Sequence, residues 1–364
     1  MHILYFITSH GYGHGVRSSA ICNCFPPEVF VTFRTDLPDH FFQEEVRIGH
    51  QVRKGMFDIG CVQSDGVTVD REKSLQRYSD IEKRNETALE HEVQWCIDNR
   101  ADVIVSDITP FAFEVAARAG IPSVAVSNFT WHDIYSEYLP SFPRFKEMLE
   151  RMAGQYRLAD RVLALYPAGD MACFSTVEKV PVVGRKGKNR KEEISREYGF
   201  DRKKNLGLIY TGNFGMDRGK WHRLERFSDW EFVGVYPLAG EPSNYHLVSK
   251  DRFRYQDLSA SADCIISKMG YGVFSESLLN GIPLVYLPRE HFAEFPVLDR
   301  EARKLGTGVP LGTEQFLDLR WDEALEKAFA LKGVLTVSDE GALRCAQEIV
   351  RMNKGCKNCS PIIE

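Results

Sequence analysis

The strongest constraint on the fold is an alternation of short β-branched segments with helical segments, which begins near residue 2 and again near residue 205. Such alternation predicts parallel sheets covered by helices on both faces. In the first series we expect strands at 2–8, 29–33, 102–106, 122–127 and 161–166, and helices at 15–24, 74–99 and 111–119. In the second series we expect strands at 205–210, 230–235, 264–266 and 283–287, and helices at 255–261, 273–279 and 300–305. The sequence therefore predicts an α/β protein with two Rossmann-like halves.

The chain length sets the expected domain boundaries. At 364 residues the chain exceeds one ordinary domain and suits two. We expect an N-terminal unit over 1–184 and a C-terminal unit over 185–340, then a helix at 341–353 that can cross back to the first unit, and a tail at 354–364. Two such units place ligands in a cleft at the carboxyl ends of their strands, where loops and helix N-termini converge.

The charge and cysteine patterns narrow the class of protein. The net charge is −5, and the densest positive run, Arg185–Lys191, is interpreted as a solvated linker, so no nucleic-acid partner is expected. No apolar run is long enough to predict a transmembrane helix or a secretory leader. The nine cysteines are scattered, and Cys356 and Cys359 fall in the expected tail without further metal ligands. We expect a cytoplasmic protein without a metal site, and peripheral membrane contact and oligomeric state stay open.

Glycine-rich turns follow two of the expected strands. The first, Gly11–Gly15, lacks the dinucleotide-binding spacing, because Val16 stands where a third glycine is needed. The second lies within 267–276 and opens a helix, whose N–H groups and dipole favour a phosphate. Lys268 adds a positive charge there, and the Glu276 carboxylate can accept hydrogen bonds from a ribose diol. A glycine turn before a helix is also a common structural element, so this pattern alone leaves both interpretations open.

Four blocks of the sequence together resemble GT-B glycosyltransferases, a superfamily that includes the UDP-glycosyltransferases and the peptidoglycan N-acetylglucosaminyltransferase. The blocks are Ser9–His14, Lys268–Glu276, Leu279–Pro288 and Arg289–Pro296, and they occur in the expected order within about residues 1–310. The likeness is greatest to the glycosyltransferase-like N-terminal part of arabinokinases. The resemblance implies a GT-B fold, with two Rossmann-like domains facing each other across a cleft, and a nucleoside diphosphate-sugar donor, with a UDP-sugar favoured.

The resemblance also implies roles for individual residues on the donor side. The residues matched to nucleotide and diphosphate binding are Gly13, Thr211, Gly212, Asn213, Arg254, Tyr255, Lys268, Gly270, Tyr271, Gly272, Ser275 and Glu276. His10, Glu290 and Glu294 are matched to the donor sugar or the acceptor. The Asp-Gln pair that often binds the donor sugar in the family is absent after Pro288, so Glu290 or Glu294 would substitute and the sugar stays open.

The same resemblance places His14 at the position of the catalytic base and Asp107 at that of the aspartate that orients it. A neutral imidazole can take the proton of an attacking hydroxyl near pH 7, and a carboxylate behind the ring fixes its tautomer. Alternatives stay open at each position. Asp107 could cap the helix that follows it, His10 could be the base, and Arg17 could be no more than a helix-start residue. The segment around Trp131 could line an acceptor site or form an exposed loop.

Three functions are compatible with these patterns. The first is transfer of a sugar from a nucleoside diphosphate-sugar to a hydroxyl acceptor of unknown identity, with inversion and without an obligatory cofactor or metal. The second is a nucleotide-sugar epimerase or hydrolase, which would need further carboxylates around the sugar. The third is a non-catalytic module that binds a nucleotide-sugar. Nothing in the chain resembles a kinase domain, so sugar phosphorylation is not expected.

Overall fold

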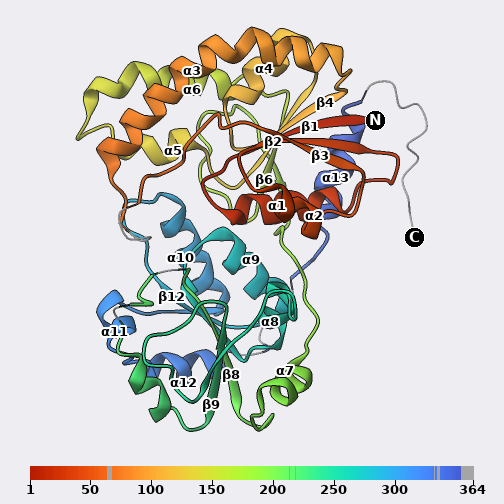
Figure 1. The fold of residues 1–364 in the computed structure, drawn as a ribbon. Helices are drawn as coiled ribbons and strands as arrows, with labels where there is room; N and C mark the ends of the chain where they lie inside the picture. Colours follow the sequence, from red (N-terminus) through yellow and green to blue (C-terminus); the bar gives the residue numbers. More distant parts are fainter. Residues whose placement is uncertain (64–67, 213, 218, 332, 334–336, 354–364) are drawn as a thin grey trace. The chain divides into compact units, whose positions relative to one another are not determined.

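The computed structural model describes residues 1–63, 68–212, 214–217, 219–331, 333 and 337–353, which form two compact units (Figure 1). The first contains Met1–Val62, Asp70–Val183 and the described residues from Glu340 onward. The second contains Gly184–Asp339 together with the described residues of Gln63–Val69. Each unit is built around its own parallel sheet, which confirms the predicted α/β class.

The first unit contains seven described strands in the spatial order β3-β2-β1-β4-β5-β6-β7, and every neighbouring pair is parallel. The strands are β1 (His2–Ile7), β2 (Phe30–Thr35), β3 (His50–Lys54), β4 (Val103–Asp107), β5 (Ser123–Ser127), β6 (Arg161–Leu165) and β7 (Glu178–Val180). The helices are α1 (Tyr12–Cys22), α2 (Asp39–Glu45), α3 (Arg71–Asp98), α4 (Phe111–Ala119), α5 (Trp131–Ser136), α6 (Lys146–Tyr156) and α13 (Gly341–Arg351), with a short 3-10 turn at Pro143–Phe145. In Figure 1, α3 and α4 cover one face of this sheet, and α1, α2 and α13 cover the other.

Burial on both faces explains the composition of the central strands. In β4 and β5 every residue is buried, and in β1 all residues after His2 are buried. A strand covered on both faces reads as a continuous apolar run instead of an alternating one. A core beneath α3 and α4 includes Leu4, Phe6, Leu89, Ile104 and Ala112.

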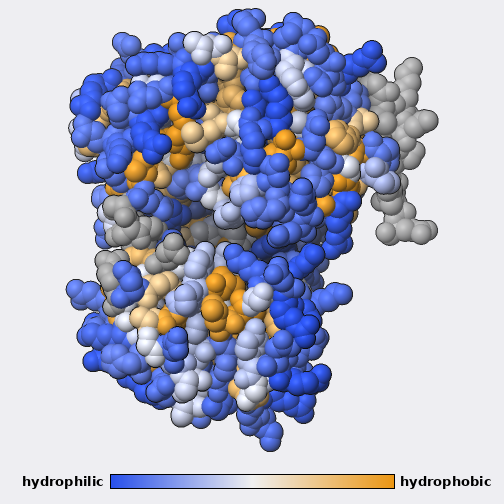
Figure 2. Space-filling view, viewed as in Figure 1, coloured by the Kyte–Doolittle hydropathy of each residue, from blue (hydrophilic) through white to orange (hydrophobic). Residues whose placement is uncertain are grey.

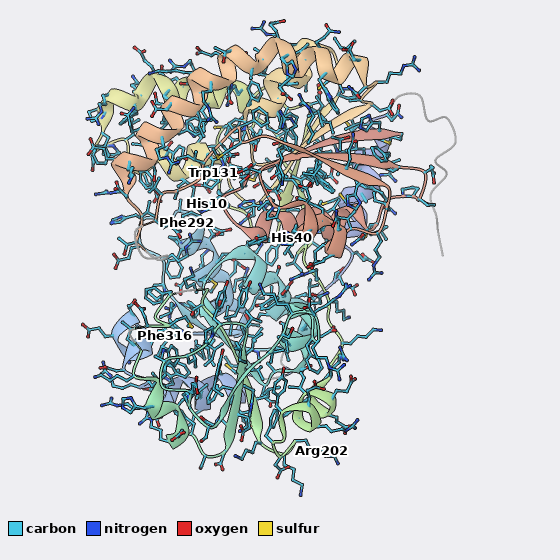
Figure 3. The ribbon with its side chains drawn as sticks, in the orientation of Figure 1. His10, His40, Trp131, Arg202, Phe292 and Phe316 are labelled. Carbon is cyan, nitrogen blue, oxygen red and sulfur yellow. The ribbon has the colours of Figure 1, made fainter. Side chains whose placement is uncertain are left out.

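The second unit contains six described strands, also parallel, in the order β10-β9-β8-β11-β12-β13. The strands are β8 (Asn205–Tyr210), β9 (Trp230–Gly234), β10 (Tyr245–Leu247), β11 (Cys264–Lys268), β12 (Leu284–Leu287) and β13 (Gly308–Pro310). The helices are α7 (Lys191–Tyr198), α8 (Tyr255–Ser261), α9 (Tyr271–Asn280), α10 (Glu294–Leu305), α11 (Thr313–Leu317) and α12 (Asp322–Ala330), with a 3-10 helix at Trp221–Arg226. Its core is rich in aromatic rings, including Phe232, Phe316 and Trp321. Phe316 is labelled in Figure 3.

The strand order creates one topological switch point in each unit. In the first unit, β1 and β4 are neighbours although three helices (α1, α2 and α3) and two strands (β2 and β3) separate them in sequence. In the second unit, β8 and β11 are likewise neighbours in the sheet although β9 and β10 lie between them in sequence. Open α/β sheets bind ligands beyond the carboxyl ends of such strands. The register pairs Ile7 with Asp107 and Tyr210 with Ser267, so the loops that follow these residues start side by side.

Several elements differ from the sequence expectation. Helix α1 begins at Tyr12 and not at residue 15, so Gly13 and His14 belong to its first turn. The expected last strand of the first half is followed by a further edge strand, β7. The segment after Trp131 is a helix with a Thr130–Asp133 capping box, and Trp131 itself is fully buried, so it is not an exposed loop. The C-terminal helix α13 packs against α1 and β7 of the first unit.

Candidate functional site

In the first unit, His14 and Asp107 meet at the carboxyl end of the sheet. His14 lies in the first turn of α1, and Asp107 is the last residue of β4, whose partner in β1 is Ile7. The Nδ1 atom of His14 lies 2.8 Å from Oδ1 of Asp107. His14 is 8% exposed, and its Nε2 atom has no hydrogen-bond partner among the described residues. When Nδ1–H donates to Asp107, the lone pair of the ring is at Nε2.

Asp107 is held by two further side chains of α1. The guanidinium of Arg17 donates from Nε to Oδ2 at 2.7 Å and from Nη2 to Oδ1 at 2.5 Å, and Ser18 Oγ donates to Oδ2 at 3.1 Å. Burial alone would raise the pKa of Asp107, but the charges and hydrogen bonds of Arg17 and His14 outweigh it and lower the pKa to about 2. Asp107 is therefore a fully buried carboxylate that is ionised at any physiological pH.

The alternative role of Asp107 as a helix cap is wrong. Helix α4 begins after Pro110, and no side chain caps it. The interpretation of Arg17 as a simple helix-start residue is also wrong, because its side chain is the main partner of Asp107. One signal in the sequence could have found it: Arg17 is three residues after His14, so both lie on the same face of α1.

His10 packs in the loop between β1 and α1 and lies close to a second buried acid. Its ring makes an edge contact with Trp131 at a centroid distance of 5.2 Å, and its Nδ1 accepts the backbone N–H of Cys61 at 3.2 Å (Figure 3). Asp58 lies nearby and accepts hydrogen bonds from the hydroxyls of Thr8 and Thr109. Burial raises the pKa of Asp58, and the two hydroxyls only partly offset that effect. The sequence analysis did not single out Asp58.

In the second unit, the turn after β11 leads into α9 without a cap. Gly270 is the N-cap residue and offers no side-chain cap, and the first turn has no acidic residue. A Cβ atom built on Gly270 would meet no atom within 4 Å, so the space beside this turn is open. Lys268 ends β11 immediately before it. This combination of uncapped N–H groups, helix dipole and lysine favours an anion.

Glu276 is buried in the same helix and is paired with Arg185. Its Oε1 atom accepts a 2.7 Å hydrogen bond from Arg185 Nε, and Glu276 is 1% exposed. The guanidinium of Arg185 also lies 5.8 Å from the ring centroid of Tyr255. The Tyr255 hydroxyl is buried without a hydrogen-bond partner among the described residues, and burial together with the charge of Glu276 raises its pKa well above the ordinary value. Arg185 therefore contacts residues of both α8 and α9.

The interpretation of Arg185–Lys191 as a solvated linker is therefore wrong in part. Arg185 is bonded to Glu276, and Lys191 forms a 2.7 Å ion pair with Asp263. The segment can run against α8 because Gly187 lacks a side chain: a Cβ there would fall 1.8 Å from the carbonyl oxygen of Gln256. Pairing with acids distant in sequence is therefore what holds this charged segment against the second unit.

The remaining sequence-predicted residues of the second unit differ in their degree of exposure. Thr211 is buried and donates its hydroxyl to the carbonyl of Phe214 at 3.0 Å, and Gly212 has φ +63. Arg254 is exposed at the start of α8, and Ser275 bonds back to the Gly272 carbonyl at 2.9 Å. Tyr271 and Glu294 are buried, whereas Glu290 is exposed. Asn213, Cys356 and Cys359 lie outside the described residues.

Solved structures establish the fold class of the chain. The glycosyltransferase of kitacinnamycin matches with a TM-score of 0.63 and 19% identity over 97% of this chain and 99% of that one. A UDP-glucosyltransferase from Polygonum tinctorium matches with a TM-score of 0.63 and 13% identity over 96% and 98%. MurG from Acinetobacter baumannii matches with a TM-score of 0.57 and 13% identity over 96% and 99%. The chain has the GT-B fold, as the sequence predicted.

A curated relative gives the more particular likeness. The chain is 32% identical over 337 residues to L-arabinokinase of Arabidopsis thaliana, which covers 90% of this chain and 32% of that protein. The chain thus spans about a third of the length of the relative that it matches. No protein-family model matches the chain.

Within the described residues, no helix is long and apolar enough to span a bilayer. Hydrophilic side chains cover most of the face shown in Figure 2, with smaller apolar patches between them.

Proposed function

We propose that this protein is a glycosyltransferase that moves a sugar from a nucleoside diphosphate-sugar, with UDP-sugars favoured, to a hydroxyl acceptor. The observation that carries the proposal is the 2.8 Å contact between His14 Nδ1 and Asp107 Oδ1, at the switch point of a GT-B unit. The names of the similar structures, which include glycosyltransferases and a UDP-glucosyltransferase, support the same reaction class.

In this proposal His14 acts as the general base. The acceptor hydroxyl attacks the anomeric carbon and gives its proton to His14 Nε2, while the bond from that carbon to the diphosphate oxygen breaks. Asp107 accepts the Nδ1–H of the ring throughout, which keeps the lone pair at Nε2. Attack from the side opposite the leaving group inverts the anomeric centre. Base catalysis of this kind contributes roughly 10²–10⁴ in rate.

On the donor side, the second unit binds the nucleotide in this proposal. The uncapped N-terminus of α9 and Lys268 receive the diphosphate and stabilise its developing charge, without an obligatory metal. Glu276 accepts hydrogen bonds from the ribose diol, and the backbone near Arg254 and Tyr255 contacts the base. Glu290 or Glu294 contacts the donor sugar.

A thermal-shift screen of the full chain against UDP-, GDP-, ADP- and dTDP-sugars tests the nucleotide part of the proposal. One nucleotide should raise the melting temperature in a concentration-dependent way. If no nucleotide does so, the chain is not a nucleotide-sugar protein of any kind. His14→Ala then tests the base: it should retain donor binding and lose transfer to an acceptor panel.

A non-catalytic nucleotide-sugar module is the second candidate. It is favoured by the match to about a third of a relative that is named for a kinase activity. Binding without transfer or hydrolysis across the acceptor panel would support this module and contradict the transferase. Release of nucleoside diphosphate without an acceptor would instead indicate the hydrolase alternative.

A further inference from the structure

Arg17 is the most extensively bonded charged side chain around His14. It is 2% exposed and forms a two-point ion pair with Asp107. Its Nη1 also donates to Oδ1 of Asn128 at 2.5 Å, and its Nη2 lies 3.3 Å from Ser127 Oγ. The same Nη2 lies 3.0 Å from His14 Nδ1. One guanidinium therefore joins α1 to the ends of β4 and β5.

This arrangement determines the net charge next to the His14 imidazole. Arginine stays protonated in proteins, so a buried Arg17 carries a full positive charge. A lone buried carboxylate 2.8 Å from an imidazole would favour the imidazolium, which has no lone pair at Nε2 and cannot act as a base. The Arg17 cation balances that carboxylate. Among the described residues, Asp58 also interacts with His14 through space, and it is held by Thr8 and Thr109.

We propose that Arg17 is a positioning residue that fixes Asp107 as the acceptor of the His14 Nδ1–H and balances the charge of Asp107, so that the ring presents its lone pair at Nε2. The catalytic meaning of this inference rests on the proposed function. The effect of Arg17 on the charge of His14 does not depend on the proposed function, because it can be measured even if the protein transfers no sugar. The chain thus has an Asp–Arg–His group where the sequence predicted an Asp–His pair.

The test is an NMR titration of the full chain labelled with ¹⁵N-histidine. The chain has ten histidines, so the His14 signal is assigned by its loss in His14→Gln. In Arg17→Met, the unbalanced Asp107 should move the His14 titration midpoint upward by about one pH unit or more, since an opposite charge at this distance favours the charged form by roughly that amount. Arg17→Lys keeps the charge and should leave the midpoint close to that of the unmodified chain. An unchanged midpoint in a folded Arg17→Met protein would overturn the proposal.

A second comparison covers the case in which Arg17→Met does not fold. Asp107→Asn removes the carboxylate and leaves Arg17 unbalanced, whereas the double variant Arg17→Met/Asp107→Asn removes both charges. If the charge of Arg17 reaches His14, the midpoint must be higher in the double variant than in Asp107→Asn. Equal midpoints would show that Arg17 has only a structural role. Asp58→Asn in the unmodified background measures the separate contribution of Asp58.

Donor-binding and transfer assays on the same variants keep the two proposals apart. A shift in the midpoint without transfer in the unmodified protein would uphold the role of Arg17 and reject the transferase. If the unmodified protein transfers a sugar but the His14 midpoint does not move in Arg17→Met, the transferase proposal is upheld and the role of Arg17 is rejected. If both hold, the acid limb of the rate profile of Arg17→Met should move upward together with the midpoint.

Discussion

Replacing Asp107 with asparagine tests the charge balance at the end of β4 through the pH dependence of folding. Burial disfavours the charge of Asp107, but Arg17 and His14 lower its pKa from 3.8 to about 2. At about 1.36 kcal/mol per pH unit, this lowering of the pKa corresponds to about 2 kcal/mol of stability. Because the folded chain binds this proton less tightly than the unfolded chain, the carboxylate contributes that stability above about pH 4 and loses it as the pH falls toward about 2.

The assay is urea unfolding of the full chain at several pH values from about 2 to 7. The readout is labelling of Cys22, which is buried in α1 of the first unit, with a disulfide reagent that still reacts in acid. On acidification the unmodified chain should lose about 2 kcal/mol more than Asp107→Asn. Asp80→Asn, exposed on α3, is the matched control and should show the full loss. The reasoning is refuted if Asp107→Asn keeps the acid dependence of the unmodified chain.

Three further predictions concern the second unit. Glu276→Gln should weaken nucleotide binding, measured by calorimetry, by about tenfold or more, because a charge-assisted hydrogen bond contributes roughly 1.5–3 kcal/mol. Glu326, exposed on α12, is the control position, and Glu326→Gln should bind the nucleotide normally. Gly270→Ala should keep the melting temperature of the unmodified chain, because the added Cβ meets no atom within 4 Å. The same variant should lose affinity for the diphosphate, and an unchanged affinity would show that no ligand approaches this turn. Arg185→Met should destabilise the second unit by about 3 kcal/mol, since it removes the ion-pair partner of a buried carboxylate. Arg185→Met/Glu276→Gln should recover most of that loss in urea unfolding read at Cys264.

The fold was predictable because its central elements carry strong local signals. The ranges expected for β8, α4 and α8 coincide with those in the structure. The strands that the sequence did not predict are β3, β7, β10 and β13, which lie at the edges of the two sheets. Three of them have only three residues, and β3 is partly exposed along its length. An edge strand needs little apolar surface, so its sequence resembles a loop. Hydrogen bonds to an already formed neighbour, and not local propensity, define these strands.

The site was predictable only where the resemblance supplied positions. His14 and Asp107 were paired in this way, and the structure places them in contact, although their roles stay predictions. The two arginines that balance the buried acids were missed, because each pairs with a residue about ninety positions away. Apart from the three-residue spacing of Arg17 from His14, nothing local in the sequence indicates that Arg17 or Arg185 pairs with a buried carboxylate. Only the sheet order brings each guanidinium to its carboxylate.

The two units have the same kind of glycine turn, followed by different side chains. Gly11-Tyr12-Gly13 and Gly270-Tyr271-Gly272 each follow a strand and start a helix, and neither helix has a side-chain cap or an acidic first turn. Gly11 has φ −177 and Gly270 has φ −164, which is extended backbone that any residue adopts, so strain does not require glycine at either position. What the two glycines share is open space, since a Cβ on either would meet no atom within 4 Å.

Side chains placed after each turn then separate the two roles. In the first unit the fourth residue counted from Gly11 is His14, which reaches Asp107, whereas the equivalent residue after Gly270 is the apolar Val273. In the second unit the acid is one turn further on, at Glu276, and its cation comes from the segment before α7. Both units therefore pair one buried carboxylate with one arginine, but only the first adds an imidazole to that pair. On this reasoning, loss of His14 should abolish chemistry and leave binding, whereas loss of Glu276 should weaken binding first.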